Sequence, residues 1–138
     1  MSSDRDTTVA TATVTSEEKP YGVRIDAGGH VLRGDEPPDH GGADTGPPPF
    51  GLLLSGLGAC TAITLRMYAE RQNWPLAGVS VKLAYVVKDR QSRWIDRLIT
   101  VHGVDDGQRE KLAEIAEKTP VTKAVRAGTE IRTIVQLG

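Results

Sequence analysis

The sequence predicts a single α+β domain, in which a β-meander precedes a long apolar helix and a β-hairpin follows it. Three observations support this fold class. The chain has 138 residues, close to the usual size of one domain. Residues 51–65 carry no charge, and two alternating apolar and polar runs flank a polar turn within residues 79–102. We therefore expect one domain over residues 1–138, with about residues 1–6 disordered.

The N-terminal third has the pattern of a β-meander. Small and β-branched residues alternate over residues 7–15, which is typical of a strand with one half-buried face. Residues 21–26 and 30–33 flank Gly28 and Gly29, and a glycine pair supplies the positive φ angles that tight hairpins need. Residues 34–49 then hold five Pro and four Gly, so we expect a loop there without a helix or a ladder.

The central helix is expected to begin at Pro48 or Pro49, where a missing N–H costs little, and to run to about Gln72. The segment 73–75 ends in proline and stops it. Arg66 interrupts the apolar run before the roughly 18 residues that a membrane span requires. The run therefore predicts a buried core helix and no membrane contact.

Cys60, the only cysteine, shares a face of this helix with residues at the i±3, i±4 and i±7 positions. These are Leu53, Gly56, Leu57, Ile63, Thr64 and Met67. Gly56 and Gly58 each cost about 1 kcal/mol inside a helix, which indicates that another backbone approaches closely there. Because the helix has more apolar circumference than one sheet can cover, we expect an obligate homodimer.

The C-terminal half predicts a hairpin, two helices and a strand. Residues 79–88 and 94–102 alternate around the polar turn and form the hairpin. Asp105 and Gln108 resemble a capping box, and the helix that they start ends near residue 118. Thr119 then caps a short helix over residues 121–126, because its hydroxyl can accept an N–H of that helix. Residues 129–137 are expected to form a final strand.

Composition excludes several classes of function. A net charge of −1 and few aromatic residues argue against a nucleic-acid partner. One cysteine cannot form an intramolecular disulfide, and the polar N-terminus lacks a signal peptide, so we expect a cytoplasmic protein. His30, His40 and His102 lack the paired spacing of a metal site. We expect neither a metal nor a cofactor.

Four segments, residues 30–37, 41–47, 57–62 and 65–69, occur in the order and spacing of one subgroup of the OsmC/Ohr family (osmotically inducible protein C and organic hydroperoxide resistance). The chain resembles this family over nearly its whole length. The resemblance implies the family's α+β fold and an intertwined dimer. It also implies a thiol peroxidase, in which a cysteine of the long helix attacks a peroxide and a second cysteine resolves the sulfenic acid.

Cys60 matches the first cysteine of the resemblance, but other site positions differ. The second position resembles Lys-Cys-Pro-Val-His in the family, while this chain has Thr119 where that cysteine stands. The family also has a carboxylate at the start of the long helix, where this chain has Phe50 and Gly51. An arginine of the N-terminal meander holds the thiolate in the family, and the nearest candidate here is Arg24, with residue 19, a lysine, behind it.

These observations leave Cys60 either as an inert core thiol or as a reactive one. The first hypothesis is an OsmC-like thiol protein of the organic hydroperoxide or oxidative-stress response, with Cys60 as nucleophile and an external thiol as reductant. The alternative is a catalytically degenerate dimer that binds a hydrophobic small molecule against Phe50, Leu53 and Leu57. A purely structural or partner-binding role is the third.

Overall fold

The computed structural model describes residues 6–18 and 20–138, which divide into two compact units, Met1–Leu53 and Leu54–Gly138. The single domain stays a prediction. Of the disorder predicted over about residues 1–6, residues 1–5 lie outside the described residues, and so does residue 19.

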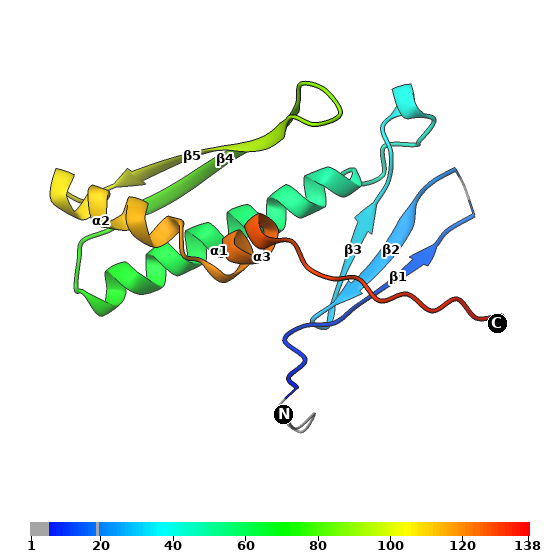
Figure 1. Cartoon of the computed structure of the whole chain (residues 1–138), viewed down its shortest axis with the longest axis horizontal. Helices are drawn as coiled ribbons and strands as arrows, with labels where there is room; N and C mark the ends of the chain where they lie inside the picture. Colours follow the sequence, from blue (N-terminus) through cyan, green and yellow to red (C-terminus); the bar gives the residue numbers. More distant parts are fainter. Residues whose placement is uncertain (1–5, 19) are drawn as a thin grey trace. The chain divides into compact units, whose positions relative to one another are not determined.

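The first unit contains a three-stranded antiparallel sheet in the order β1-β2-β3 (Figure 1). Its strands are β1 (Ala12–Ser16), β2 (Val23–Ala27) and β3 (His30–Gly34). Gly28 and Gly29 have φ angles of 58° and 79°, as the predicted tight turn requires. The predicted meander is therefore confirmed, but its first strand begins at Ala12 and not at residue 7. Ala12 pairs with Ala27, the last residue of β2, so residues before Ala12 have no strand opposite them.

The segment between β3 and the long helix is the predicted loop, with one difference. It contains a short 3₁₀ helix, η2 (Pro38–His40), which the sequence did not predict. Proline at a first helical position costs no hydrogen bond, so the proline run permits this turn. The buried carboxylate of Asp35 accepts the backbone N–H of Glu36 at 2.7 Å and both the N–H and the hydroxyl of Thr45, at 3.1 and 2.6 Å.

The long helix α1 (Pro49–Arg71) has nearly the predicted bounds. Its end coincides with a positive φ of 58° at Asn73, ahead of Pro75. By length and composition α1 could cross a membrane. Only 22% of its most apolar window is buried in this chain. The predicted core helix is therefore buried in this chain only in part. A single face is buried, made by Leu57, Gly58, Thr61, Leu65 and Ala69.

The two inner glycines of α1 differ in their surroundings. A Cβ atom at Gly56 would have no other heavy atom within 4 Å among the described residues. A Cβ atom at Gly58 would lie 2.9 Å from Cδ1 of Leu83, which is a side chain. The predicted close approach of another backbone is thus wrong at both positions, because a side chain approaches Gly58 and open space surrounds Gly56.

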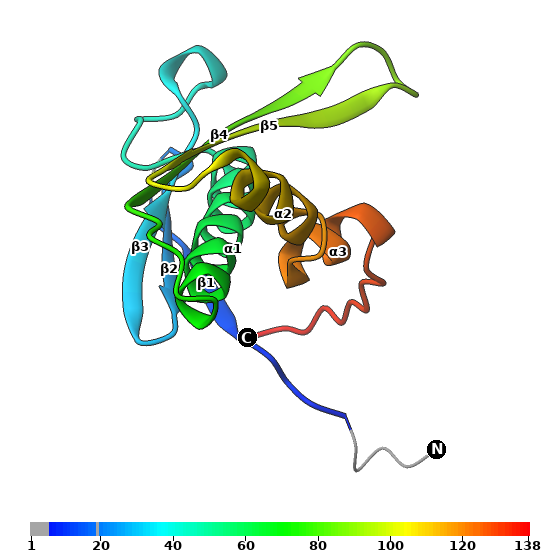
Figure 2. The same cartoon turned by 90° about the vertical axis from the view of Figure 1, so that its left-hand side faces the viewer.

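The second unit surrounds the buried face of α1 with a hairpin and two helices (Figure 2). The hairpin pairs β4 (Gly78–Val87) with β5 (Arg93–His102), and the helices are α2 (Asp106–Ala116) and α3 (Pro120–Ala127). The core of this unit consists of Leu65, Ala69, Leu76, Leu112 and Ala116. Val79 of β4 and Ile99 of β5 pack against it, so the apolar face of the predicted hairpin contributes to the core with α1 and α2.

The two C-terminal helices begin in different ways. The predicted capping box at α2 is confirmed, since Asp105 Oδ1 accepts the N–H of Gln108 at 2.8 Å and Gln108 Oε1 accepts that of Asp105 at 3.1 Å. Thr119 is the N-cap residue of α3, but its hydroxyl accepts no backbone N–H there. It lies instead 2.6 Å from the hydroxyl of Thr122. The predicted side-chain cap is wrong, because the Thr119 hydroxyl bonds the Thr122 hydroxyl and not a backbone N–H of α3.

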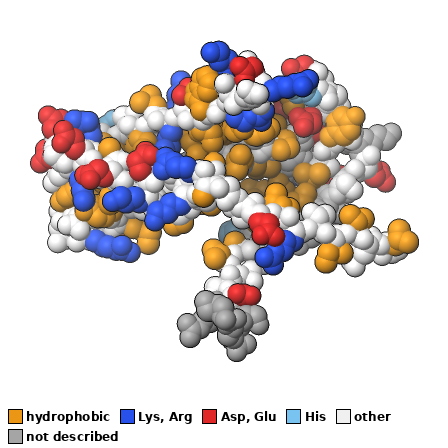
Figure 3. Space-filling view, in the orientation of Figure 1, with side chains coloured by type: hydrophobic (Ala, Val, Ile, Leu, Met, Phe, Trp, Pro, Cys, Tyr) orange, Lys and Arg blue, Asp and Glu red, His pale blue; other side chains and the backbone are white. Residues whose placement is uncertain are grey.

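Residues 129–137 form neither a helix nor a strand, so the predicted final strand is wrong for this chain. A strand requires a neighbour to hydrogen-bond with, and none of the described strands pairs with this segment. Its apolar side chains are almost fully exposed: Ile131, Ile134, Val135 and Leu137. The space-filling view shows hydrophobic side chains open at the surface of the chain (Figure 3).

Candidate functional site

Cys60 lies in the middle of α1 at the border between the buried face and an exposed apolar face. It is a free, half-buried thiol. Its Sγ atom lies 4.0 Å from the hydroxyl of Thr64, one turn further along the helix. Ile63 and Met67, on the predicted face of Cys60, are exposed. The thiol is therefore not enclosed in the core of this chain.

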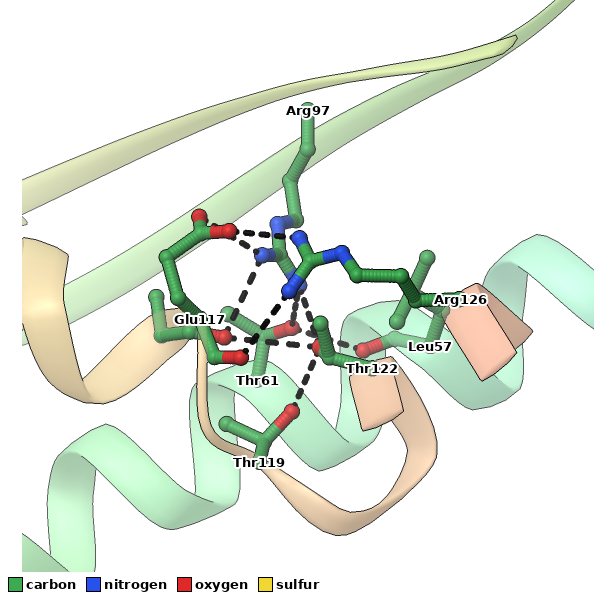
Figure 4. A network of polar contacts seen from close by, with 8 residues as sticks. Leu57, Thr61, Arg97, Glu117, Thr119, Thr122 and Arg126 are labelled. Atoms are coloured by element: carbon green, nitrogen blue, oxygen red, sulfur yellow. Dashed lines mark hydrogen bonds and ion pairs between the residues drawn. The ribbon is translucent and has the colours of Figure 1, made fainter. Parts of the chain in front are cut away.

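Thr61, the residue after Cys60, takes part in a buried polar network that is shown in Figure 4. We call this the Arg97 network, and it consists of Thr61, Arg97, Ala116, Glu117, Thr119, Thr122 and Arg126. It joins α1, β5, α3 and the end of α2. The turn of α1 that carries Cys60 is thus held by groups from elements far apart in the sequence.

Arg97 is the centre of the network because the strand alternation points it inward. In β5 the inward positions are Ile95, Arg97, Ile99 and Val101, while their neighbours are exposed. Its side chain is only 11% exposed. One terminal nitrogen donates to the hydroxyls of Thr61 and Thr122, at 3.0 and 2.8 Å, and the other to the carbonyl of Ala116 at 3.2 Å. These hydrogen bonds offset the cost of burying the charge.

The threonine hydroxyls of the network have defined roles. Thr61 donates its proton to the carbonyl of Leu57 at 2.8 Å and can therefore only accept from Arg97. Thr119 is fully buried, and its hydroxyl bonds that of Thr122. Among the described residues, no buried side-chain nitrogen or oxygen lacks a hydrogen-bond partner. The network is therefore satisfied, as buried polar groups must be.

Glu117 closes the network at the surface. Its Oε1 accepts from Arg126 at 2.5 Å, and its Oε2 lies 3.4 Å from the guanidinium of Arg97. The hydrogen bond from Arg126 is the largest cause that holds the pKa of Glu117 below its ordinary value of 4.5. The charges of Arg126 and Arg97 act in the same direction, and burial opposes them. Glu117 is therefore anionic at neutral pH.

Arg24, Phe50 and Thr119 are the remaining predicted site residues. Arg24 is in the first unit, where its guanidinium forms two exposed hydrogen bonds of 3.1 Å with the carboxylate of Asp26. Phe50 is exposed at the start of α1. The hydroxyl of Thr119 bonds that of Thr122, and Arg97 donates to the hydroxyls of both Thr122 and Thr61. In the described part of the chain, no three His, Cys, Asp or Glu side chains are placed to hold a metal ion.

Sequence reasoning missed Arg97, Glu117 and Thr122. A signal for Arg97 was present, because the alternation over residues 94–102 puts it on the same side as the apolar Ile95 and Ile99. A charged residue at an inward strand position predicts a buried partner or a site. The partners themselves could not be predicted locally, because they come from α1 and α3.

Comparisons with known proteins place this geometry in context. A family model described as OsmC-like protein matches residues 41–134, while no curated protein matches. A Psychrobacter arcticus structure named for an osmotic stress induced and detoxification response is 20% identical, with a TM-score of 0.72 over 87% of this chain and 90% of that one.

Two further structures carry a name for hydroperoxide resistance. One, the organic hydroperoxide resistance protein OsmC from Legionella pneumophila, is 17% identical, with a TM-score of 0.64 over 88% of this chain and 92% of that one. The other, from Vibrio cholerae, has captopril bound in one of its active sites. It is 20% identical, with a TM-score of 0.63 over 88% of each chain. These likenesses confirm the predicted α+β fold class.

Proposed function

Because the chain belongs to the OsmC-like protein family, as its motifs predicted, we propose that it reduces organic hydroperoxides through Cys60, with an external thiol as the reductant. The observation that carries the proposal is the position of Cys60, half-buried beside exposed apolar side chains of α1. A peroxide with an organic body needs both an accessible thiol and an apolar surface next to it. The names of the structural neighbours support the same class of function.

The proposed reaction has two stages. The Cys60 thiolate attacks the terminal oxygen of the hydroperoxide, the O–O bond breaks, and the products are a sulfenic acid and an alkoxide that takes up a proton. The sulfenic acid condenses with an external thiol and releases water, which leaves a mixed disulfide. A second external thiol then attacks this disulfide and restores Cys60. The external step is needed because Thr119 occupies the position of the resolving cysteine.

Two arginines have proposed roles at this thiol. Arg97 acts as a positioning residue, since its hydrogen bond to Thr61 fixes the helical turn that carries Cys60. Arg24 is proposed to contact the thiolate directly. It could do so only if its exposed ion pair with Asp26 opened, and such pairs contribute little to stability.

We also propose that the protein is a soluble, cytoplasmic homodimer. Ile63 of α1 is 59% exposed, and Met67 and the apolar residues of the C-terminal tail are exposed as well. An exposed apolar surface of this kind suits a second copy of the chain. Light scattering at micromolar concentration should give the mass of a dimer. A monomer whose melting does not depend on protein concentration would contradict this.

The alternative function is binding of a hydrophobic small molecule without turnover. The missing cysteine at position 119 and the missing carboxylate at Phe50 and Gly51 favour it, because the chain then lacks the second thiol and the acidic group of the family's peroxidases. In that case Cys60 would remain a reduced thiol in the presence of a hydroperoxide.

Intact mass measurement distinguishes the two. Wild type and Cys60→Ser are treated with stoichiometric cumene hydroperoxide, with and without an added dithiol, and cumyl alcohol serves as the matched control. We expect addition of oxygen to wild type only, reversed by the dithiol. Oxidation of Met67 would instead persist, since a dithiol does not reduce a sulfoxide under these conditions. Unmodified wild type would contradict peroxidase chemistry and leave the binding function.

A further inference from the structure

A pocket of about 590 Å³ opens in the second unit between the hairpin, α1 and α3. This volume is in the usual range for small-molecule sites. Trp94 and Val125 contribute apolar walls, and the charged groups are Arg93, Arg97, Arg126 and Glu117. Cys60 does not line the pocket. The lining of this pocket is therefore distinct from the thiol of the proposed function.

The charge of the pocket favours an anion. Three arginines and one glutamate line it, in a chain whose net charge is −1. Arg97 supplies its cation from a nearly buried position, where the field of a charge is screened less than at the surface. The pocket is thus a positive site on a protein that is otherwise slightly negative.

Glu117 indicates where the anion would bind. Its carboxylate accepts from the guanidinium groups of both Arg97 and Arg126, as a ligand carboxylate would (Figure 4). The contact with Arg97 is 3.4 Å, whereas good charge-assisted hydrogen bonds of this kind measure about 2.7–2.9 Å. The Glu117 side chain is 57% exposed and can turn toward water. Arg97 therefore has room for a closer acceptor.

We propose that this pocket binds a small carboxylate with an apolar body. The ligand carboxylate replaces that of Glu117 as the acceptor for Arg97 and Arg126, and the apolar body contacts Trp94 and Val125. Arg93, an exposed residue of the pocket lining, adds to the attraction. Both wall residues are partly exposed in this chain, so their burial by the ligand contributes favourably.

Octanoate is a suitable probe, and octanamide is its matched neutral control. Binding is followed by calorimetry and by the fluorescence of Trp94, with Trp94→Phe to separate its signal from that of Trp74. Arg126→Met removes an exposed ligand-binding cation, and Arg90→Met removes an exposed arginine that does not line the pocket. Glu117→Gln removes the competing carboxylate. Circular dichroism checks that each variant is folded.

We expect octanoate to bind at least about tenfold more tightly than octanamide, which corresponds to about 1.4 kcal/mol. Arg126→Met should lose that preference, Arg90→Met should keep it, and Glu117→Gln should bind octanoate several-fold more tightly than wild type does. Equal binding of octanoate and octanamide, an unchanged preference in Arg126→Met, or no binding in the millimolar range would overturn the proposal. Cys60→Ser should bind octanoate as wild type does, which separates this result from any failure of peroxidase activity.

Discussion

Arg97 of β5 donates a 3.0 Å hydrogen bond to the hydroxyl of Thr61 of α1, the residue next to Cys60. The same nitrogen of Arg97 donates to Thr122 of α3. A single buried cation therefore ties the hairpin and the last helix to the turn that carries the only thiol. Removing this cation should affect both the stability of the second unit and the environment of Cys60.

Arg97→Met should destabilise the protein by about 2 kcal/mol or more, because it removes the hydrogen bonds that Arg97 donates to the carbonyl of Ala116 and to the hydroxyls of Thr61 and Thr122. Chemical unfolding at one fixed protein concentration measures the loss. Arg93→Met, at an exposed position of the same strand, is the control and should stay within about 0.5 kcal/mol of wild type. Equal effects of the two substitutions would show that the buried hydrogen bonds contribute nothing.

The two glycines of α1 should respond in opposite ways. Gly56→Ala should raise stability by up to about 1 kcal/mol, because alanine is the better helix former and nothing in the described chain is near the new atom. Gly58→Leu should lower stability by about 1–3 kcal/mol, since its Cβ alone would already be 2.9 Å from Leu83. Thermal melts of both variants test this. A lower melting temperature for Gly56→Ala would contradict the open surroundings of that residue.

Most elements could be predicted because their signals are local. The alternation of residues 79–88 and 94–102 predicted β4 and β5, and the pair Asp105 and Gln108 predicted the start of α2. The failures have a different cause. Whether residues 129–137 form a strand depends on a neighbouring strand, which no local pattern supplies.

The candidate site could be predicted only in part for the same reason. The resemblance to the family identified Cys60 as the candidate nucleophile, whereas the residues alone left it either an inert or a reactive thiol. The hydroxyls that surround Arg97 come from Thr61 and Thr122, which are far from it in the sequence. The hydroxyl of Thr119 has the chemistry of a helix cap, but the fold places the Thr122 hydroxyl within hydrogen-bond distance of it. The sequence alone does not show which of the two partners, a backbone N–H or the Thr122 hydroxyl, the Thr119 hydroxyl bonds.

Acid should weaken the loop of the first unit through Asp35. The hydroxyl of Thr45 is the largest cause that lowers the pKa of Asp35 from its ordinary value of 3.8; backbone N–H groups also lower it, and burial opposes them. A carboxyl group with a lowered pKa in the folded state stabilises the fold above pH 3.8. This stabilisation is lost as the pH falls from 3.8 through the lower pKa that Asp35 has in the folded protein.

Thr45→Val removes this hydroxyl, so the pKa of Asp35 should move up toward its ordinary value. Carbon-detected NMR titration of the carboxyl group measures the shift directly. The variant should be less stable than wild type at neutral pH, and the two stabilities should converge as the pH falls below 3.8. Thr100→Val, at an exposed position of β5, is the control and should leave the titration unchanged. A difference in stability that stays constant with pH would assign the effect to packing instead.

Thr119→Cys should give the protein a second thiol able to condense with oxidised Cys60. Thr119 is the N-cap residue of α3, and Thr122 and Arg97 link it to Thr61, the neighbour of Cys60. Loss of the hydroxyl costs about 1 kcal/mol, which a folded dimer should tolerate. A thiol at this position also faces the positive end of α3, which favours the thiolate. We expect an internal disulfide more readily than restored turnover, since the substitution supplies only the second step.

The disulfide closes without backbone movement only if the two Cα atoms lie within about 7 Å. After a stoichiometric organic hydroperoxide, intact mass should therefore show loss of the two thiol hydrogens in Thr119→Cys, and a dithiol should restore them. Lys123→Cys, on the exposed side of α3, is the matched control and should form no internal disulfide. The double variant Thr119→Cys with Cys60→Ser should form none either. If both thiols of Thr119→Cys remain free in the folded protein, either Cys60 does not form a sulfenic acid or residue 119 lies out of its reach. Oxygen addition to wild type distinguishes these two causes, because it depends on Cys60 alone.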